Sequence, residues 1–595
     1  MKWDLKSLSE GGLLCALDRQ LAQRLIPEGG PVQTALALLS YALTQGHVGL
    51  DLSQLLRSQW PLAEGVLELS PPSAQELEAA LNSHPLVGAP LEYKPLIWDG
   101  KRLYFQKYFD YQQRLIANIQ DRLAQPSAPL TAELLKAHRE AFAGLAALNQ
   151  GQPLAALLAA VMPFFILTGG PGTGKTTTAF KMLLLLQQSR LDQGQAPLKI
   201  QLVAPTGKAA ARLGESMNAQ KVGLQRELAE SLPDQAQTLH RFLGYQPFSP
   251  QDFLHHQGFL AEVDLLLLDE ASMVDLPLFV KLLEALPVEC KVILMGDPDQ
   301  LASVESGAVL GDLAQDKDPR GLRQSFAEQL AELAPEGPFE AAGPALLDHR
   351  LRLKQSHRFD PNRGIGRLAE AVRLDHSPLL PLLQSEQTEH LEVKDPAAFK
   401  TQVERLLKAG LKPMHQSLDP TQALAAQRKF QLLTALRLGP YGVEGVNLIG
   451  EGLWGHNQSF YPHRPILITQ NAPHLGLSNG DLGLCLPDAQ AVLKVWFEGP
   501  EGPRAVPLAL LPAHQSAYAL TVHKSQGSEF DQVVLALPEV FCEPLCRELV
   551  YTALTRAKTR FCLLGSAEVF EEAVRQSATR HSGLGAAFWG EPAAP

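Results

Sequence analysis

The 595-residue sequence contains only six cysteines and no long apolar run. Six thiols in a chain of this length are too few for a disulfide framework, so a secreted fold stapled by disulfides is excluded. The longest uncharged apolar stretch, 154–168, is shorter than the roughly 18 residues that cross a bilayer, and Pro163 interrupts it. The first residues, 1–12, carry charges and lack the apolar segment of a signal peptide. These absences predict a cytoplasmic protein without a membrane anchor.

Metal-ligand patterns and internal repeats are also missing. Cys542 and Cys546 form a C-x3-C pair with no second ligand pair nearby, which favours structural thiols. His255 and His256 are adjacent and would point in opposite directions on an extended segment, which favours solvated loop residues. No structural metal is expected. The absence of a repeat of about 20–50 residues excludes solenoids and propellers.

Positive charge is in deficit, because 52 Lys and Arg residues face 63 Asp and Glu residues and the formal net charge is −11. This balance excludes a nonspecific DNA coat that relies on a large basic surface. It is compatible with a narrow channel that holds a few phosphates at a time, since the cations can be confined to that channel.

The pattern along the chain changes twice. Residues 1–124 predict a mostly helical domain, which ends in a hairpin turning at Asp99-Gly100 and a helix through Leu123. The Pro-containing segment 125–129 is the expected linker. Beyond it, short apolar strands alternate with helices, which is typical of a parallel sheet covered on both faces. The expected strands form two sets, at 164–168, 200–204, 263–269 and 292–296, and at 431–433, 466–469, 533–537 and 561–564.

Two tandem α/β domains with parallel sheets are therefore predicted, at 125–345 and 346–595. Between 480 and 516 the strands become short and are broken by Gly and Pro, so we expect a small β insertion in the second domain.

A P-loop follows the first of these strands. Residues 169–176 read Gly-Gly-Pro-Gly-Thr-Gly-Lys-Thr, after an apolar strand and before a helix. Backbone N–H groups wrap the phosphates, Lys175 reaches the β and γ phosphates, and the Thr176 hydroxyl can bind Mg²⁺. ATP and Mg²⁺ are the expected cofactors. The predicted nucleotide-binding residues are Gly169, Gly170, Pro171, Gly172, Thr173, Gly174, Lys175, Thr176 and Thr177.

Two later strand ends carry the polar groups that hydrolysis needs. Asp269, after the strand of four leucines, is expected to hold Mg²⁺ together with Thr176, and the neighbouring Glu270 to polarise the attacking water. After the strand at 292–296, Gln300 is positioned to sense the γ phosphate.

Together these segments resemble the motifs of superfamily 1 helicases, namely 169–176, Asp-Glu-Ala-Ser-Met at 269–273 and Gly-Asp-Pro-Asp-Gln-Leu at 296–301. The C-terminal half adds Thr-Val-His-Lys-Ser-Gln-Gly-Ser-Glu-Phe at 521–530 and Val-Tyr-Thr-Ala-Leu-Thr-Arg-Ala-Lys at 550–558, which resemble motifs V and VI. The resemblance implies that ATP lies in a cleft between two RecA-like domains.

The resemblance also implies three residues that complete the nucleotide site. Phosphoryl transfer develops negative charge, which an arginine from the second domain can stabilise. Arg556 is the first candidate, and Arg358, in a segment that resembles motif IV, is the second. Gln152 stands where the superfamily has a glutamine that reads adenine.

A track for single-stranded DNA is implied as well. Residues 204–213 resemble motif Ia, which grips the phosphate backbone in the superfamily, and 238–241 resemble motif Ib. For each polar residue of the track, a helix-cap or loop role is the alternative. The expected DNA-binding residues are Thr206, Gly207, Lys208, Thr238 and His240 on the first domain and Thr521, His523, Lys524 and Ser525 on the second.

Residues 103–108, 430–437, 439–443 and 479–481 resemble the RecD family, the alpha subunits of bacterial exodeoxyribonuclease V. The resemblance is close at 150–320 and 350–565, loose in the first 95 residues and absent for 324–343, an expected insertion.

This resemblance implies a 5′ to 3′ DNA helicase motor that acts on duplex DNA ends in recombinational repair. Its expected partners are a RecB-like helicase-nuclease subunit and a RecC-like scaffold subunit in a heterotrimer, docked through residues 1–124. The alternatives are a nucleotide-binding assembly subunit that does not translocate, a stand-alone RecD-like helicase, and a P-loop enzyme that does not act on DNA.

Overall fold

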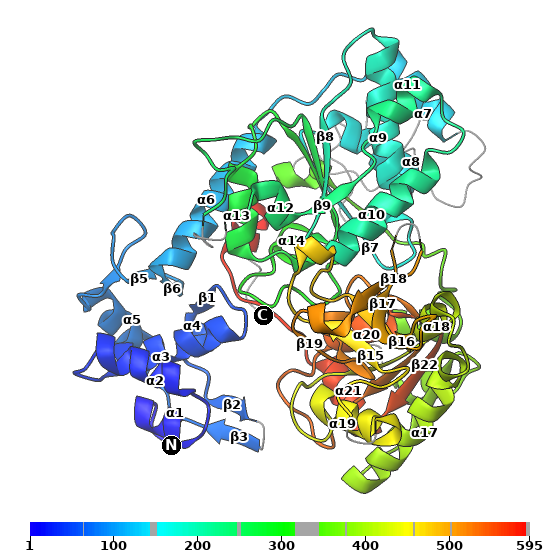
Figure 1. Ribbon diagram of the computed structural model, residues 1–595. Helices are drawn as coiled ribbons and strands as arrows, with labels where there is room; N and C mark the ends of the chain where they lie inside the picture. The colour runs from blue at the N-terminus through cyan, green and yellow to red at the C-terminus, as the bar shows by residue number, and fades with distance from the viewer. Residues whose placement is uncertain are drawn as a thin grey trace.

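The computed structural model describes residues 1–62, 65–142, 151–246, 252–315, 344–374, 378–455, 458–499 and 502–590. The expected insertion at 324–343 lies outside these residues. Figure 1 shows an N-terminal region in blue, a first α/β core in cyan and green, and a second core in yellow to red. Among the described helices, none combines the length and the apolar character that crossing a bilayer requires.

A six-stranded parallel sheet forms the first core, in the order β12-β7-β11-β10-β8-β9. Its central strand β10 is four leucines, all buried, as expected for a strand covered on both faces. The four strands predicted for this domain are confirmed. The strands are β7 (Phe164–Gly169), β8 (Ile200–Ala204), β9 (Ala236–Thr238), β10 (Leu265–Leu268), β11 (Lys291–Gly296) and β12 (Arg350–Leu353). The helices of this core are α7 (Ala132–Ala141), α8 (Gly151–Val161), α9 (Lys175–Asp192), α10 (Gly207–Gln220), α11 (Arg226–Ser231), α12 (Leu239–Leu243), α13 (Leu276–Glu284) and α14 (Val309–Leu313).

Strand β12 corrects the predicted boundary between the two cores. The boundary at 345/346 assigned it to the second domain, whereas it pairs with β7 from Arg350↔Ile166 to Leu353↔Gly169. Because Arg and Leu alternate in this strand, a search for continuous apolar runs passes over it. The chain crosses to the second core only after Arg358, and Ile365 and Leu368 of α16 (Gly364–Leu374) are buried there.

The second core is a five-stranded parallel sheet in the order β13-β22-β21-β14-β20. Its presence confirms two tandem parallel sheets, and three of the four strands predicted for it are correct. The strands are β13 (Thr388–Leu391), β14 (Phe430–Thr434), β20 (Ala519–Thr521), β21 (Phe530–Ala536) and β22 (Ala557–Leu564). The helices are α16, α17 (Pro396–His415), α18 (Pro420–Gln427), α19 (Val443–Trp454), α20 (Arg547–Leu554) and α21 (Ala567–Arg575).

The small β insertion is an antiparallel sheet in the order β18-β17-β16-β15-β19. It begins earlier than expected, because the run predicted as a core strand at 466–469 forms β15 of this sheet. An apolar run that is buried on both sides has the same pattern in a parallel core and in a small antiparallel sheet, so its pattern did not separate the two. The strands are β15 (Pro465–Ile468), β16 (Leu482–Pro487), β17 (Leu493–Phe497), β18 (Arg504–Pro507) and β19 (His514–Ser516).

The N-terminal region contains more sheet than predicted. The expected hairpin is confirmed, with β5 and β6 paired from Leu96↔Phe105 to Trp98↔Leu103. It is the centre of a four-stranded sheet in the order β1-β6-β5-β4, whose outer strands are too short for a periodic signal. The elements are α1 (Leu5–Glu10), α2 (Ala16–Leu25), α3 (Pro31–Thr44), β1 (Gly49–Asp51), α4 (Leu52–Leu55), β2 (Gln59–Leu62), β3 (Gly65–Glu68), α5 (Ala74–Ser83), β4 (Val87–Gly88), β5 (Leu96–Trp98) and β6 (Arg102–Phe105).

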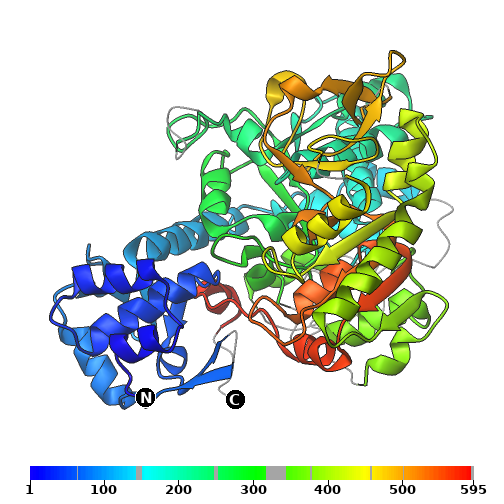
Figure 2. The same ribbon diagram turned by 60° about the horizontal axis from the view of Figure 1, so that its bottom comes forward.

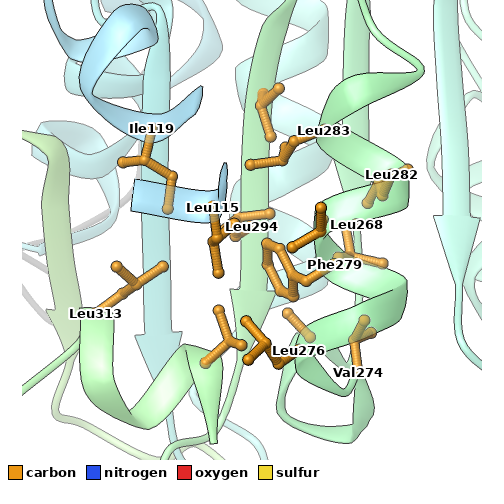
Figure 3. Packing of buried hydrophobic residues seen from close by; sticks show 14 of the residues in the cluster. Leu115, Ile119, Leu268, Val274, Leu276, Phe279, Leu282, Leu283, Leu294 and Leu313 are labelled. Atoms are coloured by element: carbon orange, nitrogen blue, oxygen red, sulfur yellow. The ribbon is translucent and has the colours of Figure 1, made fainter. Parts of the chain in front are cut away.

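Helix α6 (Gln106–Leu123) leaves this region and packs on the first core. Figure 3 shows its Leu115 and Ile119 beside Leu283 and Phe279 of α13 and Leu294 of β11. The predicted boundary at 124/125 therefore falls at the end of a helix that packs on the first core.

Arg122 fixes the end of α6 to the end of α13. Its side chain is 1% exposed, and its Nη atoms donate to main-chain carbonyls at and just beyond the last turn of α13. A guanidinium is suited to this place because it carries five donors and the helix C-terminus carries partial negative charge. The carbonyls are those of Leu283, Leu286, Pro287 and Cys290, at 3.0–3.2 Å.

The last described residues, 576–590, form a C-terminal strap that returns to the start of the chain. The amides of Val48 and Gly49 donate to the carbonyl of His581, whose ring stacks on His47 at 5.0 Å between centroids. Helix α22 (Leu584–Trp589) then packs against α14 and α6. In Figures 1 and 2 this red segment lies between the blue N-terminal region and the green first core. The strap thus joins the beginning of the chain to the first core.

Candidate functional site

The P-loop lies between β7 and α9, as predicted. Gly172 and Gly174 have φ values of +74° and +83°, which only glycine adopts without strain. The Lys175 ammonium lies over the loop and donates to the carbonyls of Gly169 and Gly170 at 2.6 and 3.1 Å. The loop therefore has the backbone shape that directs amides and one ammonium toward a phosphate chain.

Gln152 is placed against this loop by α8. It is 5% exposed, and its Nε2 donates to the Thr173 carbonyl at 3.2 Å. A Cβ on Gly174 would come within 2.3 Å of the same nitrogen, so the amide and the loop are in close contact.

Arg358 is also held on the P-loop, by the residues before it. Ser356 Oγ donates to the Pro171 carbonyl at 3.0 Å, and the His357 amide donates to the Gly172 carbonyl at 2.8 Å. The expectation that Arg358 reaches in from the second domain is thus wrong in its direction, because its backbone rests on the first core. Its Nη1 is buried and has no hydrogen-bond partner among the described residues, which marks it as a donor available to a phosphate.

Asp269 and Glu270 follow β10 at the same edge of the sheet. Burial, reinforced by the negative charge of Glu270, raises the pKa of Asp269 to about 7, and the nearby Lys175 opposes this rise. Glu270 has φ +52°, a left-handed conformation that costs a non-glycine residue about 1–2 kcal/mol. Two adjacent carboxyls and the Thr176 hydroxyl are the oxygen donors that Mg²⁺ prefers, so these residues fit that ion.

Gln300 and Arg556 meet where the two cores are in contact. Gln300 Nε2 donates to Asp297 Oδ2 at 3.0 Å, and its Oε1 accepts from Arg556 Nη2 at 2.9 Å. Arg556 is 4% exposed and also donates to the carbonyls of Thr552 and Ser528 at 3.1 and 3.3 Å. Burial lowers its pKa, although nearby carboxylates including Glu270 oppose this shift. The structure therefore brings both residues together, one from each core.

Further contacts between the cores involve residues not singled out in advance. The Leu301 amide donates to Thr552 Oγ1 at 2.9 Å, and the Leu301 carbonyl accepts from Gln526 Nε2 at 2.8 Å. Glu529 pairs with Arg358 and Arg212. Gln526, Glu529 and Thr552 lie inside the motif-like segments, but only the folded chain shows which members of these segments face the cleft.

The expected DNA residues of the first core follow neighbouring strands. Thr206 comes shortly after β8 and Thr238 is the last residue of β9, and because these strands pair in parallel, both residues stand at one edge of the sheet. Each threonine also caps a helix, accepting from the amides of Ala209 at 3.2 Å and Arg241 at 3.3 Å. The cap role is thus present in both, as the alternative reading stated.

The other three residues of this set differ in exposure. His240 is exposed on α12. Gly207 touches the loop before β16, since its Cβ would lie 2.5 Å from Ser478 Oγ. Burial lowers the pKa of Lys208 to about 8, with help from Arg212.

The second core contributes the segment after β20. Thr521 Oγ1 accepts a hydrogen bond from the backbone amide of the exposed Lys524 at 3.3 Å. Burial lowers the pKa of His523. Ser525 is fully buried and donates to the Val522 carbonyl at 2.7 Å, so the DNA contact expected for it does not fit its placement.

Three family models match parts of this sequence. They are described as the RecBCD enzyme subunit RecD N-terminal domain at residues 10–104, an AAA domain at 152–306 and a UvrD-like helicase C-terminal domain at 516–564. These stretches cover the N-terminal sheet, most of the first core including the P-loop, and the segment from β19 through β22.

Relatives of known identity are similar over most of the chain. RecBCD enzyme subunit RecD of Haemophilus influenzae is 35% identical over 534 residues, which cover 82% of this chain and 81% of that protein. The same subunit of Mycolicibacterium smegmatis is 34% identical over 596 residues, covering 95% and 96%. The ATP-dependent RecD2 DNA helicase of Deinococcus radiodurans is 34% identical over 433 residues, covering 70% and 49%.

Among solved structures, Bacteroides Pif1 bound to ssDNA is 16% identical, with a TM-score of 0.37, over 75% of this chain and 94% of that one.

Proposed function

We propose, from the premise that this chain belongs to the family of RecBCD enzyme subunit RecD, that it moves 5′ to 3′ along single-stranded DNA. It is an ATP-dependent DNA helicase subunit of a RecBCD-type enzyme. The direction of movement comes from the family resemblance of the sequence, and the ATP site and the cleft support a motor of this class.

One observation carries the proposal most directly, the contact between Gln300 and Arg556. The two residues come from different cores and meet beside the P-loop, where the Tyr551 hydroxyl of the second core lies 3.0 Å from a Cβ placed on Gly170. Loss of the γ phosphate removes the negative charge that would draw both cores together. Hydrolysis is therefore linked to closing and opening of the cleft.

Each polar group at the cleft has a role in this proposal. The P-loop amides and Lys175 hold the β and γ phosphates, and Gln152 forms a hydrogen bond with the adenine base. Glu270 orients the attacking water, while Arg556 and Arg358 stabilise the charge that develops on the γ phosphate. Thr176 and Asp269 would hold Mg²⁺, which neutralises phosphate charge when bound.

For DNA we propose two grips at the sheet edges. Thr206, Gly207 and Lys208, with Thr238 and His240, form the grip of the first core. Thr521, His523 and Lys524 form that of the second. Because the two grips lie on separate cores, a change in cleft width alters their spacing, which is the geometric requirement of inchworm movement.

The partners follow from the family. The enzyme is a RecBCD-type complex, so we propose a RecB-like helicase-nuclease subunit and a RecC-like scaffold subunit, with duplex DNA ends as substrate. The N-terminal domain at 1–124 is the proposed docking surface, and the cytoplasm the proposed compartment.

The test is ATP hydrolysis by the purified chain with and without single-stranded DNA, together with unwinding of duplexes that carry a 5′ or a 3′ overhang. We expect stimulation by DNA and unwinding from the 5′ overhang. Unwinding from the 3′ overhang would contradict the direction. Hydrolysis that ignores DNA, both alone and with co-purified partner subunits, would favour the non-translocating assembly subunit.

A further inference from the structure

Glu529 stands just before β21 in the second core and is paired with two arginines of the first core. Its Oε1 accepts from Arg358 Nη2 at 2.7 Å, and its Oε2 lies 3.3 Å from Arg212 Nη2. Arg212 Nη1 also donates to the carbonyl of Gly527 at 2.9 Å. We call these three side chains the Arg212–Glu529–Arg358 clasp.

One end of the clasp is anchored at the ATP site. The backbone before Arg358 is hydrogen-bonded to the P-loop, and a Cβ on Gly172 would lie 2.4 Å from Arg358 Cβ. Within the part of the chain that the structure describes, Arg358 Nη1 is buried and has no hydrogen-bond partner, while Nη2 holds the carboxylate. The guanidinium can thus engage a phosphate and Glu529 at the same time.

The other end is anchored on the helix that carries a DNA grip. Arg212 lies on α10 four residues after Lys208, so both side chains stand on one face of the helix, a single turn apart. Helix α10 is continuous from Gly207 to Gln220, and a shift of its N-terminus is carried to Arg212 as a rigid displacement.

The charges in the clasp favour tight pairing. Burial raises the pKa of Glu529, but the positive charges of Arg212, Arg358 and Arg556 together outweigh burial and hold that pKa below its usual range. The Glu529 side chain is 17% exposed and that of Arg358 25%, so water screens this pair less than an ion pair on the open surface.

We infer that Glu529 is a positioning residue that couples occupancy of the DNA grip on α10 to the placement of Arg358 at the ATP phosphates. The inference rests on the proposed function. The carboxylate belongs to the second core and both arginines are held by the first, so a movement that separates the cores breaks these pairs. Anything that closes the cleft from the DNA side therefore also orders Arg358, and by linkage nucleotide binding strengthens DNA binding by the same factor.

The test measures this linkage by equilibrium binding with the full chain. Affinity for a fluorescent non-hydrolysable ATP analogue is measured with and without saturating oligothymidylate, and DNA affinity with and without the analogue. We expect the parent chain to show a coupling factor within the usual range of about 5–150. Glu529→Gln and Arg212→Gln are each expected to bring the factor below about 2, with each separate affinity changing by less than about 3-fold.

Three further variants sharpen the result. The double variant is expected to lose no more coupling than either single one, since both remove one connection. Arg212→Lys, which keeps the charge, is expected to restore part of the coupling. Arg560→Gln breaks a 3.5 Å pair with Glu389 inside the second core and is expected to leave coupling intact.

Unchanged coupling in Glu529→Gln would overturn the inference. So would a loss of nucleotide affinity measured without DNA, because Glu529 would then contact the ligand itself. Absence of coupling in the parent chain, together with ATP turnover that ignores DNA, would instead overturn the proposed function. The two failures are therefore distinguishable.

Discussion

At the scale of the residue, the Lys175 ammonium is the clearest test of the nucleotide site. It donates to the P-loop carbonyls of Gly169 and Gly170. We expect Lys175→Ala to lower ATP turnover by at least about 100-fold, because the variant removes a positive charge that stabilises the phosphate during transfer. Steady-state hydrolysis and circular dichroism check the activity and the fold. Lys199→Ala, which removes an exposed partner of Glu262, is the matched control. Retained turnover in a pure preparation would contradict the assignment.

Arg556 tests the role of the second core in the chemical step. We expect Arg556→Ala to bind nucleotide but to hydrolyse it about 10³-fold more slowly, since the arginine acts on charge that develops during transfer. Nucleotide binding by fluorescence and single-turnover hydrolysis separate the two steps. Because Arg556 also donates to two carbonyls of its own core, Arg556→Lys serves as the milder companion variant. Loss of binding alone would mean that Arg556 positions the ground-state phosphate.

The sequence predicts those parts of the candidate site whose residues follow one another in a motif at the end of a recognisable strand. The P-loop, Asp269 and Glu270 lie at ends of strands whose apolar runs are plain. Glu529 could not be found in this way, because its partners are Arg212 and Arg358, far away in sequence, and its importance lies only in their meeting. Ser525 shows the opposite case, since its motif-like setting hides a buried hydroxyl that is already satisfied by Val522.

At the scale of the element, two strands were assigned to the wrong domain or sheet for the same physical reason: the apolar pattern of a strand does not indicate which sheet it joins. Strand β12 alternates Arg and Leu, so its apolar pattern is that of a half-exposed strand although it joins the parallel sheet. Strand β15 has the continuous apolar pattern of a core strand, yet pairs with β16 and β19 in an antiparallel sheet. A continuous apolar run indicates that a strand is buried on both faces. Which elements bury it depends on contacts that are distant in sequence.

Helix α6 gives a stability prediction at this scale. Arg122→Met removes the guanidinium that donates to four carbonyls at and beyond the last turn of α13. Those of Leu283 and Pro287 keep a main-chain amide as donor, whereas those of Leu286 and Cys290 lose the donor that Arg122 supplies. Each unsatisfied buried group costs about 1–3 kcal/mol, so we expect a marked fall in the melting temperature of the first core. Differential scanning calorimetry measures it. Arg226→Met, at an exposed ion pair with Glu230, is expected to change little. Equal melting of both variants would contradict the anchoring role of Arg122.

At the scale of the whole molecule, the C-terminal strap connects parts that lie at opposite ends of the chain. Arg580 donates to the carbonyls of Glu305 and Gly307 at 2.8 and 2.9 Å, and Ser582 Oγ to Asp312 Oδ2 at 2.7 Å. The carbonyl of His581 accepts from the amides of Val48 and Gly49. Two packed bodies, the N-terminal region and the first core, are thus held in one relative position by a short segment.

Removal of the strap tests this connection. A chain that stops after Gln576 is expected to keep nucleotide binding, because the strap's hydrogen bonds to the first core go to Glu305, Gly307 and Asp312. We expect its N-terminal region to become sensitive to limited proteolysis. Mass spectrometry of the fragments locates the cuts. Unaltered resistance of residues 1–105 in the shortened chain would show that α6 and the contacts of Leu43 and Gly46 with Ser306 and Gly307 fix the region without the strap.

The strap also affects the order in which parts of the protein can assemble during synthesis. A ribosome makes residues 47–49 early and residues 576–590 hundreds of residues later. The amides of Val48 and Gly49, at the edge of the N-terminal sheet, therefore lack the His581 carbonyl until synthesis is nearly complete. Until that segment leaves the exit tunnel, the N-terminal region is held to the first core by α6 and by the hydrogen bonds of Leu43 and Gly46 with Ser306 and Gly307, without the strap. A message cut short upstream of the strap therefore yields a chain with both cores but an unfixed front end, which cellular proteases can recognise and remove.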